Sequence, residues 1–210
     1  MEPKSILAFG AHPDDLEIGM GGTIAKLSSM GYKVQPIIAT LPNFVKSDTK
    51  EDRKSESVLS AKVMGCKSPI FLDLSPQEMV FGRKLVTLID SLITKNKPDS
   101  VFTQWYGDSH QDHQILTKSV ISACRDQDNI FMYETTIPGG ITENSFRPQL
   151  FVNISETIEI KKKALECFQS QFVRCGKIWV PAILGRCSFR GYQINSKCAE
   201  AFEVIKVKKW

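Results

Sequence analysis

The chain of 210 residues contains only three histidines, and all of them lie in two short segments that are rich in aspartate. The first segment is Gly10-Ala-His-Pro-Asp-Asp-Leu-Glu17 and the second is Gly107-Asp-Ser-His-Gln-Asp-His113. Imidazole and carboxylate groups bind catalytic zinc, which keeps one coordination position open for water. The metal lowers the pKa of its water toward ~7, and a carboxylate that is not a ligand can take the proton. The adjacent Asp14 and Asp15 supply one aspartate for each of these tasks.

A simpler interpretation applies to each segment when it is taken alone. His-Pro-Asp-Asp could form a turn in which Asp14 or Asp15 caps a helix by accepting hydrogen bonds from backbone N–H groups. Pro13 would stiffen that turn, because its ring fixes its own φ and restricts the conformation of His12. Together, however, the two segments use every histidine of the chain, which favours a metal site over two unrelated turns.

Both segments directly follow a predicted strand. Short apolar or β-branched runs predict strands at residues 6–9, 34–40, 69–72, 100–103, 130–133 and 150–154. Apolar residues at helical spacing predict helices at residues 16–30, 52–64, 81–96, 115–124 and 164–172. Beyond these, Gly176, Pro181, Gly185 and Gly191 predict turns and short antiparallel pieces.

This alternation predicts the fold class and the place of the site. Strands and helices that alternate with short connections form right-handed βαβ units, so we expect an α/β fold with a mainly parallel sheet flanked by helices. One domain spanning residues 1–210 accounts for the whole chain. Ligands of such sheets bind beyond the carboxyl ends of the strands. The two histidine segments are therefore expected to meet at that edge.

Composition and charge exclude several classes of function. Hydrophobic residues make up 42% and charged residues 24%, and no run of eighteen apolar residues is present, so no membrane span is expected. The apolar stretch at residues 5–10 is too short for a signal peptide, which predicts a cytoplasmic location. The net charge is +4, and we interpret Lys161-Lys162-Lys163 as a solvated helix face, because no nucleic-acid-binding motif accompanies it. The six cysteines lack CxxC spacing and are interpreted as reduced thiols.

Several motifs together resemble one family of enzymes. Ala11-His-Pro-Asp-Asp-Leu-Glu17 with Gly19-Met-Gly-Gly22, and the later His110-Gln-Asp-His113, are similar to the motifs of the PIG-L/LmbE-like family of zinc-dependent N-acetylglucosamine deacetylases. Further similarities, which extend the resemblance over nearly the whole chain, are Arg53-x-x-Glu56, Ser170-Gln171, Arg190-Gly191 and Ala199-Glu-Ala-Phe202. The resemblance implies a Rossmann-like fold, a Zn²⁺ cofactor and removal of the acetyl group from a small N-acetylated sugar or glycoconjugate.

The resemblance also implies which residues hold the metal. His12, Asp15 and His113 would be the zinc ligands. Asp14 would be the general base that takes a proton from the attacking water. The glycines at positions 19, 21 and 22 are expected to let neighbouring backbones approach closely rather than to contact the substrate.

Three further roles follow from the same resemblance. His110 would stabilise the oxyanion of the tetrahedral intermediate and protonate the leaving amine, and Asp112 would orient the ring of His110. Arg53 is similar to a family arginine of the substrate pocket. The alternative for Arg53 is a helix-surface arginine that pairs with Glu56.

Other classes of protein remain open from the sequence. Non-haem iron oxygenases also use two histidines and one carboxylate, but they combine a β jelly roll with His-x-Asp/Glu spacing, whereas His12 and Asp15 are three apart. A metallophosphoesterase would call for more ligands and often a second metal. A non-catalytic metal-binding protein on the same scaffold would not need the base Asp14. The sequence does not identify the sugar. It also leaves the oligomeric state open between a monomer and a homo-oligomer, because members of the family often assemble.

Overall fold

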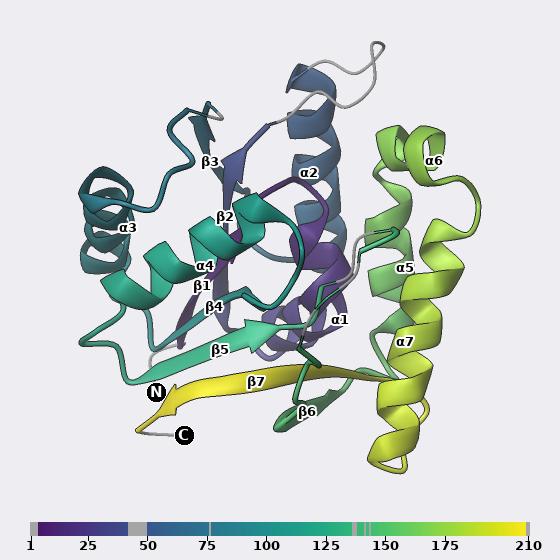
Figure 1. The fold of residues 1–210 in the computed structure, drawn as a ribbon. Coiled ribbons are helices and arrows are strands. Elements are labelled where there is room, and N and C mark those ends of the chain that lie inside the picture. Colours follow the sequence, from purple (N-terminus) through teal and green to yellow (C-terminus); the bar gives the residue numbers. More distant parts are fainter. Residues whose placement is uncertain are drawn as a thin grey trace.

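Seven strands form one mixed sheet in the order β3-β2-β1-β4-β5-β7-β6 (Figure 1). The structure, a computed structural model, describes residues 4–41, 50–75, 77–135, 138–140, 142 and 144–208. The strands are β1 (Ser5–Gly10), β2 (Lys33–Thr40), β3 (Ile70–Leu74), β4 (Ser100–Gln104), β5 (Asn129–Tyr133), β6 (Leu150–Asn153) and β7 (Ala199–Val207). The predicted α/β class with a mainly parallel sheet is confirmed.

The connections of the sheet create a switch point between β1 and β4. The first five strands run parallel, whereas β7 lies antiparallel between β5 and β6. The chain moves outward from β1 to β2 and β3 and then returns across β1 to form β4. Open α/β sheets bind ligands at the carboxyl ends of their strands where the strand order reverses. In this chain that position lies at the carboxyl ends of β1 and β4.

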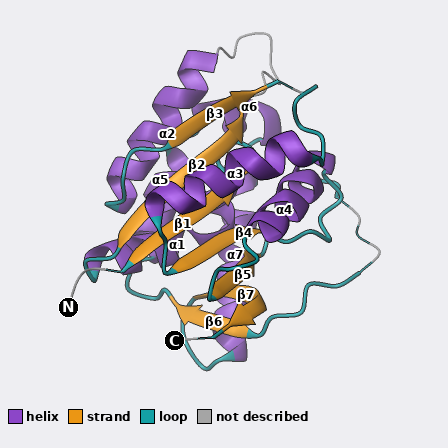
Figure 2. Ribbon diagram, turned by 90° about the vertical axis from the view of Figure 1, so that its left-hand side faces the viewer, coloured by secondary structure: helices purple, strands orange, loops and turns teal. Residues whose placement is uncertain are grey.

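Helices cover both faces of the sheet, as Figures 1 and 2 show. Alternate residues of β1 explain the two layers, since successive side chains of a strand point to opposite faces. Leu7 and Phe9 pack with α3 and α4, whereas Ile6 and Ala8 pack with α1. The helices are α1 (Asp15–Ser29), α2 (Lys50–Met64), α3 (Arg83–Asn96), α4 (Gln111–Ala123), α5 (Ile158–Glu166), α6 (Gln169–Cys175) and α7 (Trp179–Gln193).

The C-terminal part differs from the predicted turns and short antiparallel pieces. It forms the long helix α7 and the nine-residue strand β7. Pro181 lies in the first turn of α7, where a helix does not need its N–H group. Gly191 ends α7 against the backbone of Cys198, where an added Cβ would lie 2.7 Å from the Cys198 Cα. These residues therefore permit a helix and its close packing instead of marking loops.

Two expectations about the preceding helices are also wrong. The helix predicted over residues 164–172 is divided into α5 and α6, because the chain leaves the helical conformation at Phe168. Lys161 does not lie on a solvated face, because its side chain is completely buried and contacts Glu200. Its neighbour Lys163 is exposed, as predicted. Figure 1 shows α5, α6 and α7 side by side along one edge of the molecule.

Two simple structural facts concern the membrane and the cysteines. None of the described helices combines the length and the apolar character that crossing a bilayer requires. All six cysteines are free thiols, and three of them are buried.

Candidate active site

The loops that follow β1 and β4 bring the three histidines together. His12 lies just after β1, His110 directly precedes α4, and His113 lies in the first turn of α4. The ring centroid of His12 is 4.6 Å from that of His110 and 5.2 Å from that of His113. The predicted meeting of the two segments at the carboxyl edge of the sheet is confirmed.

The donor atoms of this cluster fit a metal ion. His12 Nδ1 and His113 Nε2 lie 3.3 Å apart, and Asp15 Oδ1 lies 3.3 Å from the same His113 nitrogen. A tetrahedral zinc with bonds of about 2.0–2.1 Å requires its ligand atoms to be about 3.3–3.4 Å apart. The other oxygen of Asp15 accepts hydrogen bonds from the His12 backbone N–H and from Gln104 Nε2, at 2.7 and 2.8 Å. Oδ1 is thereby turned toward the imidazole of His113, whereas Oδ2 lies 3.7 Å from His12 Nδ1.

The three histidines form a second possible ligand set. One nitrogen from each of His12, His110 and His113 lies within 4.8 Å of the others, so these residues could hold a metal ion by themselves. Both sets share His12 and His113 and differ only in whether Asp15 or His110 is the third ligand. His12 and His113 remain together in the cluster whichever of these two residues is the third ligand.

In each of the two shared histidines, the ring nitrogen that is not a proposed ligand atom contacts a carboxylate. Asp112 Oδ2 lies 3.0 Å from His12 Nε2, and Asp108 Oδ2 lies 3.0 Å from His113 Nδ1. Metal-binding histidines usually donate their second ring N–H to such a carboxylate, which fixes the tautomer and the orientation of the ring. Thr135 Oγ1 donates to Asp108 Oδ2, at 2.9 Å, and holds that carboxylate in place.

Asp112 therefore does not lie where the resemblance placed it. Its carboxylate contacts the ring of His12, and only its backbone N–H, which donates to Nδ1 of His110 at 3.2 Å, contacts the ring of His110. Asp108 and Gln104 make contacts in the site that were not predicted from the sequence. Asp108 lies inside the second histidine segment, but the sequence spacing alone could not show that it reaches His113.

The charges of the site are suited to a cation. Burial by itself lowers the pKa of His113, but the Asp15 and Asp108 carboxylates outweigh it and raise this pKa to about 10. Burial raises the pKa of Asp15, yet the His113 and His12 imidazoles hold it well below its usual range. Without a metal, the site thus retains a proton between two carboxylates. A divalent cation would replace this proton.

Asp14 lies beside this cluster in an unusual conformation. Its φ of 94° is left-handed, which costs a non-glycine residue about 1–3 kcal/mol and persists only where the surroundings enforce it. Burial raises the pKa of the Asp14 carboxyl well above its usual range against the opposing charge of Arg53, and the Asp15 and Glu17 carboxylates add to the increase. Asp14 is therefore a stronger base than an ordinary aspartate.

His110 is held as a neutral ring. Burial, followed by the charges of the His12 and His113 imidazoles, lowers its pKa. Its Nδ1 accepts the backbone N–H of Asp112 and so caps α4. Protonation of Nδ1 would break this cap, so Nε2 carries the proton and is available as a hydrogen-bond donor. The lowered pKa suits His110 to donate a hydrogen bond to the oxyanion, whereas the expected protonation of the leaving amine would require a cationic ring.

Arg53 is completely buried, which excludes the helix-surface alternative. Its Nη2 donates to the carbonyl oxygen of Pro13 at 2.9 Å and lies 3.8 Å from Asp14 Oδ2. The amide oxygen of Gln171, turned toward the guanidinium, accepts from Arg53 Nη1 at 2.6 Å. Glu56 contacts Ser170 instead, where it accepts from the backbone N–H and the hydroxyl. The described partners of Arg53 thus belong to the loop that carries Asp14 and to α6.

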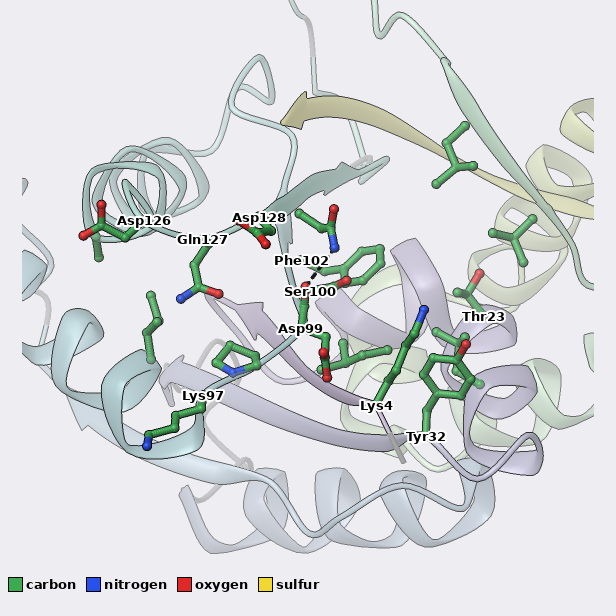
Figure 3. A pocket seen from close by; sticks show the side chains of 18 of the residues that line it. Lys4, Thr23, Tyr32, Lys97, Asp99, Ser100, Phe102, Asp126, Gln127 and Asp128 are labelled. Atoms are coloured by element: carbon green, nitrogen blue, oxygen red, sulfur yellow. Dashed lines mark hydrogen bonds between the residues drawn. The ribbon is translucent and has the colours of Figure 1, made fainter. Parts of the chain in front are cut away.

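A small cavity opens beside the histidines. Its volume is about 40 Å³, and its walls come from the β1 and β4 loops, from α6 and from the start of α7. All three histidines line it, together with Asp14, Arg53 and Trp179. A larger cavity of about 1050 Å³ lies at the opposite, amino-terminal edge of the sheet, near Lys4, Ser100 and Asp128 (Figure 3). None of the predicted site residues lines this second cavity.

The fold and the site define a Rossmann-like α/β protein with a histidine–carboxylate centre at its switch point. The model of one protein family, PIG-L (GlcNAc-PI de-N-acetylase), matches residues 7–124. An "Uncharacterized deacetylase YaiS" of Escherichia coli is 32% identical over 174 residues, which cover 80% of this chain and 91% of that protein. The chain belongs to the PIG-L family. The resemblance inferred from the two histidine segments is confirmed.

Solved structures with a similar fold include proteins with different activities. An N,N'-diacetylchitobiose deacetylase from Pyrococcus horikoshii has a TM-score of 0.84 and 25% identity, over 97% of this chain and 84% of that one. GalB, a 4-carboxy-2-hydroxymuconate hydratase from a Pseudomonas species, has a TM-score of 0.80 at 18% identity, over 99% and 98% of the two chains. The fold therefore also supports other chemistry. Family membership and the deacetylase relatives, rather than the fold, identify this chain as a deacetylase.

Proposed function

We propose that the protein is a zinc-dependent hydrolase that removes the acetyl group from an N-acetylglucosamine-type sugar. One observation carries the proposal. His113 Nε2 lies 3.3 Å from both His12 Nδ1 and Asp15 Oδ1, His12 Nδ1 lies 3.7 Å from Asp15 Oδ2, and a second carboxylate contacts the other nitrogen of each imidazole. A buried carboxylate that is not part of this set, Asp14, lies beside it.

The donor set supports zinc and the ligand choice. Nitrogen and oxygen ligands in a group of three, with one position left open, are typical of catalytic zinc. We assign Asp15 as the third ligand, because its Oδ1 has the required spacing from His113 Nε2 and because His110 uses Nδ1 to cap α4. Zinc bound there would polarise the amide carbonyl and lower the pKa of water.

The residues of the chain account for the proton transfers. Asp14 accepts one proton from the attacking water, whose oxygen forms the new bond to the carbonyl carbon. His110 donates its Nε2–H to the carbonyl oxygen as negative charge develops there. The C–N bond then breaks, and the proton held by Asp14 passes to the departing nitrogen, which leaves as an amine. The acid keeps the second proton of the water and becomes acetate when it releases this proton to the solvent or to the amine. The raised pKa of the Asp14 carboxyl suits it to both transfers.

The size of the cavity supports a small acyl group. The cavity of about 40 Å³ leaves little space beside the histidines, which suits a compact acyl group such as acetyl. The sugar would lie outside this cavity, toward Arg174 and Trp179 on its wall.

A panel of substrates tests the proposal. The zinc-loaded protein is incubated with N-acetylglucosamine, N,N'-diacetylchitobiose and other N-acetylated sugars, and acetate and free amine are measured. Equal amounts of both products are expected, and Asp14→Asn serves as a folded control that should release neither at a comparable rate. A phosphate ester and an O₂-dependent oxidation assay serve as alternatives. The proposal is wrong if one of these is turned over while no amino sugar releases acetate.

A further inference from the structure

Helix α1, which carries the proposed ligand Asp15, is interrupted one turn after that residue. Met20 has φ −145° and ψ 20°, which lie outside the helical range. The break divides α1 into a first segment that reaches Gly19 and a second segment that continues to Ser29. Sharp breaks in helices have specific causes, one of which is a side chain inserted into the backbone hydrogen-bond ladder.

Two charged side chains are inserted at this break. In a regular helix the N–H of Gly22 bonds the carbonyl oxygen of Ile18. In this chain Glu200 Oε1 accepts the Gly22 N–H at 3.0 Å, and Lys161 Nζ donates to the Ile18 oxygen at 2.8 Å. The other Glu200 oxygen accepts the N–H of Thr23 at 2.6 Å. One side chain thus caps the second segment, and the other caps the first.

The two inserted groups also bind each other. Lys161 Nζ and Glu200 Oε1 are 2.5 Å apart. Lys161 is completely buried and Glu200 is 3% exposed, so water does not screen the pair. The two residues come from α5 and β7, and their interaction therefore joins three distant parts of the chain at the break. We call Lys161 and Glu200 the α1 clamp.

The α1 clamp is connected to the active site through a single residue, Ile18. The carbonyl group of Ile18 receives Lys161, and the N–H of the same residue donates to the carbonyl oxygen of Asp14 at 2.9 Å. Asp14 is the residue with the enforced left-handed φ. A second donor, Arg186 Nη2, lies 2.8 Å from the Ile18 oxygen. Ile18 therefore links the side chains inserted at the break to the Asp14–Asp15 turn.

We propose that Lys161 and Glu200 are positioning residues that hold the Asp14–Asp15 turn in place for metal binding and catalysis. Neither residue lines the cavity beside the histidines. Their effect on the reaction would pass through Ile18 and the first segment of α1. The inference rests on the proposed function only for its effect on turnover, since metal affinity and local backbone protection can be measured without a substrate.

The test uses the full chain with both charges removed. Lys161→Met with Glu200→Gln keeps the approximate shapes and leaves no unpaired buried charge, whereas each single change leaves one charge without its partner. Amide hydrogen exchange over residues 18–23 is expected to become faster in the double variant. Zinc affinity is expected to fall by about tenfold, as for other residues that orient metal ligands. At saturating zinc, kcat should fall by about 10- to 100-fold with little change in KM.

A matched control separates positioning from a general loss of stability. Leu85→Ala removes buried apolar volume on α3, on the other face of the sheet. It should lower Tm while zinc affinity and kcat stay as in the wild type. The proposal is overturned if the folded double variant keeps wild-type zinc affinity and exchange, or if Leu85→Ala loses zinc affinity to the same degree.

A milder variant covers the case in which the double variant does not fold. Arg186→Ala removes the second donor to the Ile18 oxygen and should produce a smaller loss of zinc affinity with faster exchange over residues 18–23. Unchanged affinity and exchange in Arg186→Ala would then contradict the proposal. If the wild-type protein binds zinc but releases no acetate from any sugar, the proposed function fails, whereas the affinity and exchange results still decide the role of the α1 clamp.

Discussion

Replacing Asp112 by asparagine distinguishes two possible partners of this carboxylate. Its Oδ2 lies 3.0 Å from Nε2 of His12, whereas only its backbone N–H reaches His110. Asparagine keeps the backbone contact and removes the charge behind His12. Loss of such a partner of a metal ligand weakens metal binding by about 10- to 100-fold, which corresponds to about 1.4–2.8 kcal/mol. Asparagine can still accept the His12 N–H, so we expect the lower end of this range.

The assay measures zinc affinity by competition with a chelator and then turnover at saturating zinc. Asp112→Asn should bind zinc about tenfold more weakly and recover most of its kcat when zinc is in excess. Asp108→Asn is the matched variant, because its carboxylate lies at the same distance, 3.0 Å, from the other shared histidine. Unchanged zinc affinity in Asp112→Asn with a large loss of kcat at saturating zinc would show that Asp112 acts through His110, and the argument from His12 would be refuted.

The remaining predictions concern the base, the donor, the buried arginine and the metal-free site. Asp14→Asn should keep its zinc and lose about 10²–10⁴-fold in rate, and full activity would remove Asp14 from the mechanism. His110→Ala should lose about 10²–10³-fold in kcat with metal content unchanged by elemental analysis, and loss of zinc would make His110 the third ligand. Arg53→Ala should lower kcat by a larger factor than it raises KM, and it should also lower Tm, because the guanidinium contacts protein groups around Asp14. A change in KM alone would instead indicate substrate contact. Because the pKa of His113 is raised from 6.5 to about 10, the metal-free protein should lose stability as the pH rises from about 6.5 to about 10, and zinc affinity should increase about tenfold per pH unit over the same range. A zinc affinity that is independent of pH between 6 and 8 would contradict this.

The sequence predicted the place of the site because the topology of a parallel sheet largely determines which loops meet. A parallel sheet aligns the carboxyl ends of its strands, so two polar segments that follow β1 and β4 meet regardless of the details of their side chains. The spacing of His12 and Asp15 within one tight turn similarly restricts how far apart their donor atoms can lie. The confirmed fold and family follow from these short-range patterns.

Features that depend on distant partners were not predictable in the same way. The lysine run at residues 161–163 has the composition of a solvated face, and only the buried Glu200 of β7 explains why Lys161 points inward. Gly191 resembles a turn residue until the backbone of Cys198 is placed against it. Asp112 lies two residues after His110, in the first turn of α4, but folding places its carboxylate against His12, which is 100 residues away.

The most direct test of the account is a titration of chelator-treated protein with zinc, in which acetate release from an N-acetylated sugar is measured after each addition. The metal-free protein should be inactive, and the rate should rise in proportion to zinc and level off at about one ion per chain, as expected for one catalytic site with three protein ligands. His12→Ala or His113→Ala should abolish this response. Full acetate release by the metal-free protein, or saturation by zinc with no acetate released, would contradict the central claim.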